Sequence, residues 1–155
     1  MTRLEKQLQE CRDGGGVVLY LAGLDISDLT PFVTEFPNLQ ELYVSRTQVS
    51  DLSPLSALTQ LQTLNCRNTP VSDLLHLQDL VKLRELSVSE TQVSDLSSLK
   101  NLTNLHELYV YQTEVNDLST LKDLVNLREL DVSMTNVIDF SVLDHLVKNG
   151  LEIYK

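Results

Sequence analysis

The sequence predicts an α/β solenoid in which each repeat adds one short strand to a parallel sheet. Three observations favour this fold class. The pattern LxxLxVxxTxVxDLxxLxxLxx recurs every 22 residues in one register, its first half alternates apolar and polar residues, and the leucines of its second half stand three apart. Such periods indicate stacked units, because one unit cannot bury its apolar side without a neighbour.

Six repeats are expected over residues 16–148. A degenerate first copy begins near residue 16, and five close copies begin at Leu39, Leu61, Leu83, Leu105 and Leu127. Residues 1–15 should form a capping helix and a glycine hinge, since Leu4, Leu8 and Cys11 share one helical face. Residues 149–155, with the sequence LEIY near the end, should form a terminal strand. We expect these caps to complete a small solenoid.

Each repeat should contain a strand followed by a tight helical turn. In LYVSRTQV the apolar residues alternate with polar ones, which is typical of a half-buried strand. Leu52, Leu55 and Leu58 then share one face of a short 3₁₀ or α turn. Ser53 before Pro54 predicts a hydroxyl N-cap with proline at the first helical position.

An aspartate recurs two residues before each of these predicted caps. The six are Asp28, Asp51, Asp73, Asp95, Asp117 and Asp139. One carboxylate per repeat cannot supply the six or more oxygens that a calcium ion requires. We therefore expect Asx-type turns, in which the carboxylate accepts hydrogen bonds from backbone N–H groups.

The pattern resembles that of the leucine-rich repeat family, specifically the short 22-residue repeats of bacterial internalin-like proteins, over residues 16–155. The resemblance implies a curved parallel sheet on a concave side, short 3₁₀ or α turns on a convex side, and binding by the concave surface. Threonine stands where the family usually carries asparagine, at Thr47, Thr69, Thr91, Thr113 and Thr135. The family asparagine forms a buried ladder between coils, so the hydroxyl should do a reduced version of this, or the turn should differ.

Composition and charge limit the classes of partner. A net charge of -10 disfavours nucleic acid and anionic membranes, and favours a protein with a basic patch. No apolar run approaches the length of a membrane span, and MTRLEKQLQECRDGGG lacks the features of a secretory signal. Cys11 and Cys66 have no CxxC spacing, which argues against a disulfide framework or a zinc site. We expect a cytoplasmic bacterial protein.

Residues that could carry catalysis do not gather. The glycines at 14–16 are not followed by GK[ST], so they indicate a hinge and not a phosphate-binding loop. His76, His106 and His145 occupy three different repeat positions, so stacking does not bring them together. The sequence predicts no enzyme activity, no metal and no cofactor.

The side chains between the buried strand residues should point to the opposite face of the sheet. All five tyrosines fall on these positions. Tyrosine favours strands and can shield a sheet, but it is also enriched among interface hot spots. The predicted partner-binding residues, including the position that follows each strand, are Tyr20, Tyr43, Arg46, Asn65, Arg67, Ser87, Ser89, Glu90, Tyr109, Tyr111, Gln112, Asp131, Met134 and Tyr154, with Glu152 and Tyr154 as the last exposed pair. Two aromatic shoulders would flank a polar hollow.

A row of acids accompanies this face. Glu41, Glu85, Glu107 and Glu129 share the third repeat position, at the edge of the strand. Like charges at strand spacing repel one another, and no structural role for the row is evident. The row is either a solvated face or a surface for Lys and Arg side chains of a partner.

Three functions fit this pattern. The first is a non-catalytic protein-binding module, most specifically a bacterial immunity protein or inhibitor that neutralises a cognate toxin by direct binding. The second is an internalin-like adhesion or host-directed effector fragment. The third is a general scaffold for a basic protein. Both specific functions rest on analogy between folds.

Overall fold

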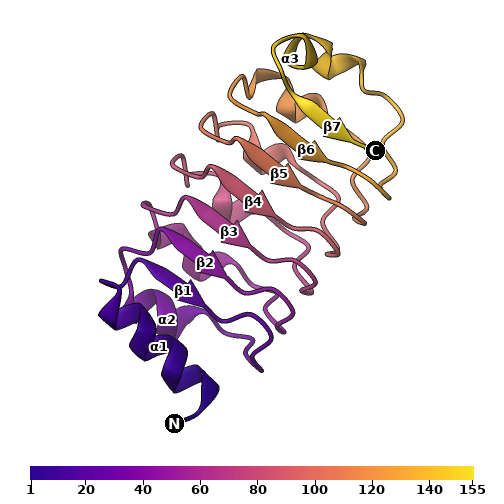
Figure 1. Ribbon diagram of the computed structural model, residues 1–155. Coiled ribbons are helices and arrows are strands. Elements are labelled where there is room, and N and C mark those ends of the chain that lie inside the picture. The colour runs from indigo at the N-terminus through magenta and orange to yellow at the C-terminus, as the bar shows by residue number, and fades with distance from the viewer.

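The computed structural model describes residues 1–155 as a stack of coils, each with a strand on one side and a short helical segment on the other (Figure 1). All seven strands are parallel and pair in chain order. They are β1 (Val18–Tyr20), β2 (Glu41–Tyr43), β3 (Thr63–Asn65), β4 (Glu85–Ser87), β5 (Glu107–Tyr109), β6 (Glu129–Asp131) and β7 (Glu152–Tyr154). The predicted leucine-rich repeat solenoid is confirmed.

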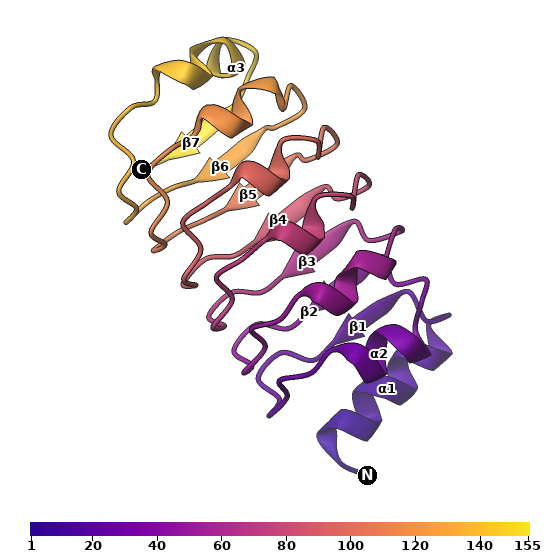
Figure 2. The ribbon, with the colours of Figure 1, turned by 180° about the vertical axis from the view of Figure 1, so that it is seen from behind.

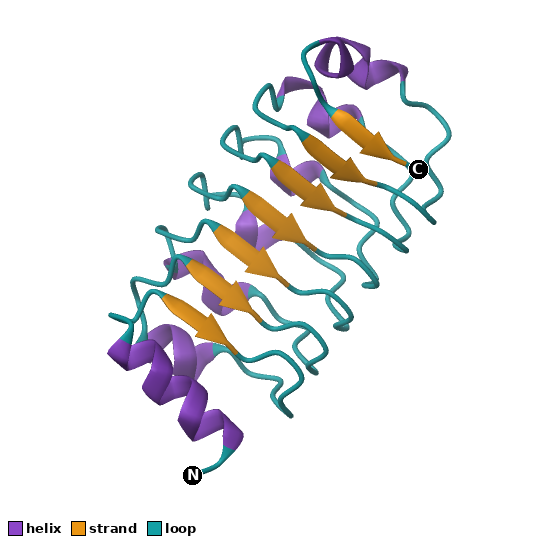
Figure 3. Ribbon diagram, viewed as in Figure 1, coloured by secondary structure: helices purple, strands orange, loops and turns teal.

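The opposite side of the stack carries the tight turns, seen from behind in Figure 2. They are α2 (Thr30–Glu35) and the 3₁₀ segments η1 (Ser53–Ala57), η2 (Leu75–Leu77), η3 (Ser97–Leu99), η4 (Ser119–Asp123) and η5 (Ser141–Leu143), with α3 (Asp144–Lys148) after the last. The sheet extends along the stack without curling (Figure 3), so the expected concavity is shallow. No helix combines the length and apolar character needed to cross a membrane.

The core lies between the strands and the turns. Leu42, Leu64 and Leu86 are register neighbours in β2, β3 and β4, and all three are fully buried. Cys66 takes the next inward position, where neighbouring coils have Val44 and Val88, and it is also fully buried. Each coil thus repeats the same inward side chains, and each inward leucine packs against its counterparts in the neighbouring coils.

The first coil is covered by α1 (Arg3–Asp13), which lies against β1 (Figure 1). Thr2 and Glu5 form a capping box at its start, with the Thr2 hydroxyl accepting from the Glu5 amide. Cys11 is buried against the core. Gly15 and Gly16 follow with φ of 82° and 72°, a left-handed turn that glycine adopts without strain.

The turns begin with aspartate, and the predicted serine N-caps are wrong. The Asp51 carboxylate accepts from the Ser53 amide at 2.8 Å, and equivalent Asx bonds recur in all six repeats. Ser53 is already the first residue of η1, and its hydroxyl donates to Asp51 instead of capping the backbone. The backbone bonds lower the pKa of Asp51, since they favour its ionised form.

The threonines at the ninth repeat position act within their own coils. The Thr91 hydroxyl donates to the Val88 carbonyl at 2.5 Å and accepts from the Val93 amide at 3.4 Å. Thr47 makes the same pair of bonds. The hydroxyl therefore closes the turn after the strand locally, and the coil-to-coil ladder of the family asparagine is replaced by backbone bonds such as Gln92 N–H to Val71 carbonyl.

Each of the strands β1 to β6 is followed by one residue in the left-handed region. Non-glycine residues hold φ between 52° and 57° at Arg46, Asn68, Glu90, Gln112 and Met134, and Gly23 takes this place in the first coil at 69°. Left-handed backbone is costly for residues with a side chain. The repeated turn aims these side chains away from the core.

The register of β7 differs from the prediction by two residues. Glu152 pairs with Glu129 and Tyr154 with Asp131, so Glu152 continues the acidic row and Tyr154 the row of Tyr109. Ile153 can then stand beside the buried Leu130. An assignment of Glu152 and Tyr154 to the positions of Asp131 and Ser133 would lose this contact.

We predict that Thr91→Val lowers the free energy of unfolding by about 1–3 kcal/mol, because it leaves a buried carbonyl and amide without their partner. Urea unfolding measures the change. Thr103→Val is the control, since Thr103 is exposed and its hydroxyl makes no hydrogen bond, so it should change stability by less than about 0.5 kcal/mol. Equal effects of the two substitutions would contradict this role of the hydroxyl.

Candidate functional site

The side chains that point away from the helical segments form three rows, here called the strand face. Strand register defines the first two rows. The third lies two residues after the middle row in each coil, where backbone bonds such as Arg46 N–H to the Arg67 carbonyl continue the stacking. The acidic row is Glu41, Thr63, Glu85, Glu107, Glu129 and Glu152. The middle row is Tyr20, Tyr43, Asn65, Ser87, Tyr109, Asp131 and Tyr154. The outer row is Ala22, Ser45, Arg67, Ser89, Tyr111 and Ser133. The acids lie on the same face as the tyrosines, so the two predicted groups form one surface.

Three tyrosine hydroxyls donate to the acidic row. Tyr43 bonds Glu41 at 2.8 Å, Tyr109 bonds Glu107 at 2.8 Å, and Tyr154 bonds Glu152 at 3.2 Å. Burial and the bonded carboxylate raise the pKa of Tyr43 and of Tyr109. Part of the row therefore has the structural role that sequence alone did not reveal.

Glu85 has no tyrosine on its own strand, because the middle row places Ser87 there. Burial raises the pKa of its carboxyl, and the charges of Glu107, Glu41 and Glu129 raise it further. The ion pairs of the chain join Lys6 to Glu10, Arg12 to Glu35 and Arg67 to Glu90. No lysine or arginine of the chain pairs with the acidic row, so its repulsion is not neutralised internally.

The first aromatic shoulder is a stacked pair. The rings of Tyr20 and Tyr43 are 4.7 Å apart between centroids and lie within 13° of parallel. Tyr20 is 51% exposed, so its ring presents a broad flat area to solvent. Tyr109 and Tyr111 form the other shoulder, while Tyr154 lies beyond Asp131 on β7.

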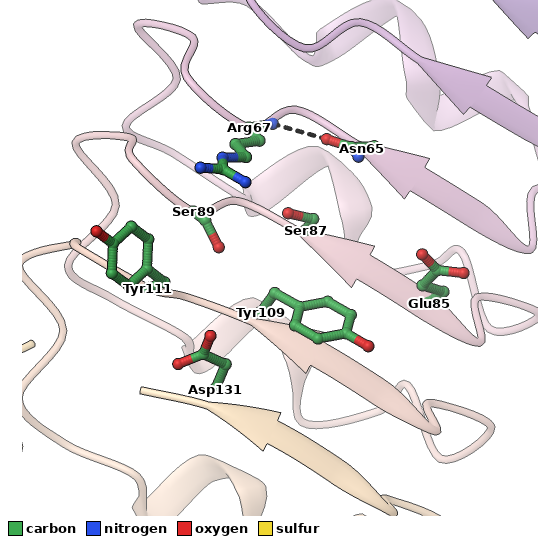
Figure 4. Close-up of a pocket in the computed structure, with 8 residues that line it drawn as sticks. All are labelled: Asn65, Arg67, Glu85, Ser87, Ser89, Tyr109, Tyr111 and Asp131. Atoms are coloured by element: carbon green, nitrogen blue, oxygen red, sulfur yellow. Dashed lines mark hydrogen bonds between the residues drawn. The ribbon is translucent and has the colours of Figure 1, made fainter. Parts of the chain in front are cut away.

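The predicted hollow is present, with a volume of about 260 Å³ (Figure 4). It runs along β4, with Tyr109 and Tyr111 on the β5 side and Asn65 and Arg67 on the β3 side. Its lining comprises Asn65, Arg67, Glu85, Ser87, Ser89, Tyr109, Tyr111 and Asp131. Glu85, predicted at a strand edge, lies at one end of this hollow.

The two serines of the hollow were predicted to be exposed, but both residues are buried. Ser87 is 7% and Ser89 is 4% exposed. Their short side chains form the floor, and the larger side chains of β3 and β5 stand on both sides (Figure 4). Sequence alternation predicted their direction correctly, but burial depends on the size of side chains in neighbouring coils.

Arg67 is held at the rim by an ion pair. Its guanidinium donates twice to Glu90, and the Asn68 amide donates to the other Glu90 oxygen at 2.9 Å. These bonds lower the pKa of Glu90. Asn68 was missed as a site residue, although it shares the repeat position of Arg46 and Glu90. The backbone amide of Arg67 donates to the Asn65 side-chain oxygen.

The predicted residues at the left-handed turns do not line the hollow. Arg46, Gln112 and Met134 are exposed at the left-handed turns, with Met134 68% exposed. Asp131, in contrast, lines the hollow. One oxygen of its carboxylate accepts hydrogen bonds from the amide and the hydroxyl of Ser133.

Groups suited to catalysis are dispersed. No three His, Cys, Asp or Glu side chains are placed to share a metal ion. His106 contacts the Asn104 carbonyl and His145 the Lys122 carbonyl, in different coils. Cys66 is a free, fully buried thiol, and burial raises its pKa to about 12, so it is no nucleophile at neutral pH.

Comparison with known proteins defines the class. A family model described as "Leucine Rich repeats (2 copies)" matches residues 37–82 and 81–123. The chain belongs to the leucine-rich repeat family, and this fold is a protein-interaction module whose members are typically non-catalytic. None of the curated proteins matches the chain.

Among solved structures, the chain is similar to bacterial internalins. The internalin inlF from Listeria monocytogenes shares 31% identity over 89% of this chain, with a TM-score of 0.80. Internalin C2 from the same organism shares 27% over 88%, with a TM-score of 0.73, and a Leptospira interrogans leucine-rich repeat protein shares 17% over 90%, with a TM-score of 0.66. The chain spans 40%, 70% and 43% of these three structures, respectively.

We predict that Glu85→Gln stabilises the protein at pH 7 by less than about 1 kcal/mol, because it removes one of several like charges. The folded pKa of Glu85 lies above its ordinary value of 4.5, so the penalty is complete above the folded pKa. It fades as the pH falls through that value, and the gain from Gln should vanish near pH 4.

Urea unfolding at both pH values measures this gain. Asp79→Asn is the charge-matched control, because Asp79 is exposed and makes no side-chain hydrogen bond or ion pair. If Glu85→Gln destabilises the protein at pH 7, or if Asp79→Asn stabilises it equally, the repulsion in the acidic row is not the cause.

Proposed function

We propose that this chain binds a protein with a basic surface through its strand face and performs no catalysis. The observation that carries the proposal is the acidic row, five glutamates without a lysine or arginine partner, beside a row of tyrosines. Opposite charges from a partner would relieve repulsion that the fold itself does not require. Tyrosine rings would add rigid contact area.

The net charge supports the same class of partner. At -10, the chain would attract a basic protein over the whole encounter and repel nucleic acid or anionic lipid. The tyrosines of the middle row also have a folding role, because three of them bond to glutamates. Tyr20 and Tyr111 make no such bond, and their hydroxyls remain free for a partner.

Within this class, the specific function we propose is inhibition of a basic bacterial toxin by direct binding, as an immunity protein does. A small acidic solenoid could cover the cationic substrate site of an enzyme that acts on nucleic acid, since both the substrate and the strand face are anionic. A cytoplasmic location goes with this proposal. Two observations support a toxin as the partner: the strand face is complementary in charge to a cationic site, and related folds act as inhibitors by analogy.

The second candidate is an internalin-like adhesion or host-directed module. The 31% identity to inlF and 27% identity to internalin C2 favour it. In that case the chain would correspond to the repeat region of a longer protein, and its partner would lie outside the producing cell. A leader or anchor in the full gene product would favour this candidate.

We predict that the double substitution Tyr109→Ala and Tyr111→Ala weakens binding of a captured partner by about 30-fold or more, since the loss of even one hot-spot tyrosine costs about 2 kcal/mol. Affinity capture from the native organism followed by titration measures the loss. Circular dichroism confirms that the variant is folded.

Val81→Ala with Val125→Ala is the matched control, because both valines are about half exposed, at 48% and 57%, and lie outside the strands. This pair should leave the affinity within about twofold. If the folded tyrosine variant retains every partner, the strand face is not the binding surface.

We predict that, if the partner is a toxin, co-expression of the chain restores growth of cells that produce it. Glu107→Lys should reduce this protection, because it reverses a charge in the acidic row, whereas Glu114→Lys, on an exposed residue outside the strands, should reduce it less. Absence of protection against any candidate toxin, together with binding to a host surface protein, would favour the second candidate.

A further inference from the structure

The hollow along β4 is floored by two serines whose hydroxyls open into it and have no hydrogen-bond partner within the chain. Ser87 and Ser89 are largely buried as residues, but their hydroxyl oxygens are not, because no fully buried side-chain oxygen of the chain lacks a hydrogen bond. Both line the hollow and lie on its floor (Figure 4). Because both hydroxyls are reachable from the hollow and are not used within the chain, they can bond to water or to a polar group that enters it.

The charge of the hollow selects a cation. Glu85 lies at one end with no bonding partner, and Asp131 lies on the β6 side. Arg67 is the single cation of the lining, and its charge is already neutralised by the Glu90 carboxylate at 2.5 Å. An anion entering the hollow would be repelled by two unneutralised carboxylates. A cation would meet no unneutralised positive charge.

The shape of the hollow selects a long side chain. The floor is built from two serines, whereas the corresponding positions in the next coil hold Tyr109, on β5, and Tyr111, just after it. The result is a channel of about 260 Å³ with two phenol rings along one side. An aliphatic stem can pack on these rings while a cationic head reaches Glu85, and aromatic faces attract cations.

We propose that the hollow is the anchor site of the partner and takes one arginine or lysine side chain, with its head at Glu85 and its stem between Tyr109 and the serine floor. This inference rests on the proposed protein-binding function and names the chemical group that enters the face. The serine hydroxyls would accept hydrogen bonds from the cationic head or from a backbone N–H of the partner. The stacked Tyr20 and Tyr43 pair would contact a second region of the partner.

The probes for the test are N-acetyl-arginine amide and N-acetyl-lysine amide, followed by NMR titration of the backbone amides. We expect saturable shifts at Ser87, Ser89 and Tyr109, with a dissociation constant of about 1–10 mM, as fits a ligand of this size. N-acetyl-citrulline amide, the neutral analogue of the arginine probe, should bind at least about fivefold more weakly. Equal binding of citrulline, or tighter binding of N-acetyl-glutamate amide, would overturn the proposal.

Two variants locate the site. Ser89→Tyr should fill the channel and therefore reduce affinity for the arginine probe about tenfold or more. The fold should accept this substitution, because the outer row already carries a tyrosine at Tyr111. Ser45→Tyr is the matched control in the same row outside the hollow, and it should change the affinity less than about twofold. Glu85→Gln keeps the shape and should also weaken the arginine probe, so the test survives if Ser89→Tyr fails to fold.

The same variants separate this inference from the proposed function. Suppose Ser89→Tyr retains a captured partner that the variant with Tyr109→Ala and Tyr111→Ala loses. The strand face then binds the partner, and the proposal of a side chain in the hollow is wrong. If neither variant loses the partner, the proposed face itself is wrong. Loss of the partner by both the Ser89→Tyr variant and the double tyrosine variant would support both proposals.

Discussion

The structure depends on the stacking of identical coils. A strand of three residues has no stability alone, so Leu86 is buried only because Leu64 and Leu108 stand beside it in register. The backbone bonds follow the same rule, as the Arg84 amide donates to the Gln62 carbonyl of the preceding coil. This constraint fixes one strand, one left-handed residue and one Asx turn in each coil.

Stacking also separates the fold from the binding surface. The inward residues of β4 and β5 are alike, while their outward residues change from serine to tyrosine, so the core tolerates either. The acidic row is different, because it carries an electrostatic penalty that the fold does not need. Tyrosine hydroxyls offset this penalty at Glu107, but Glu85 lacks such a bond. Repulsion left uncompensated at one point of a regular surface is the physical reason to expect a cationic partner there.

The sequence predicted the features that repeat and missed those that depend on neighbours. Periodicity sufficed for the strands, the 3₁₀ turns and the Asx bonds, because each recurs in the same position. It failed for Ser53, whose hydroxyl competes for the Asp51 carboxylate, and for β7, where the terminal copy is too short to fix its register. It identified most lining residues of the hollow, but the burial of Ser89 follows from large side chains one coil away. Sequence spacing does not contain that information.

A crystal structure of the chain with its captured partner would show directly whether the strand face is the interface. We expect the partner to cover the strand face from the stacked tyrosines to Tyr111, with a lysine or arginine side chain in the hollow beside Glu85. A partner that lies on the 3₁₀ segments, or that covers the tyrosines with an acidic surface, would contradict this expectation.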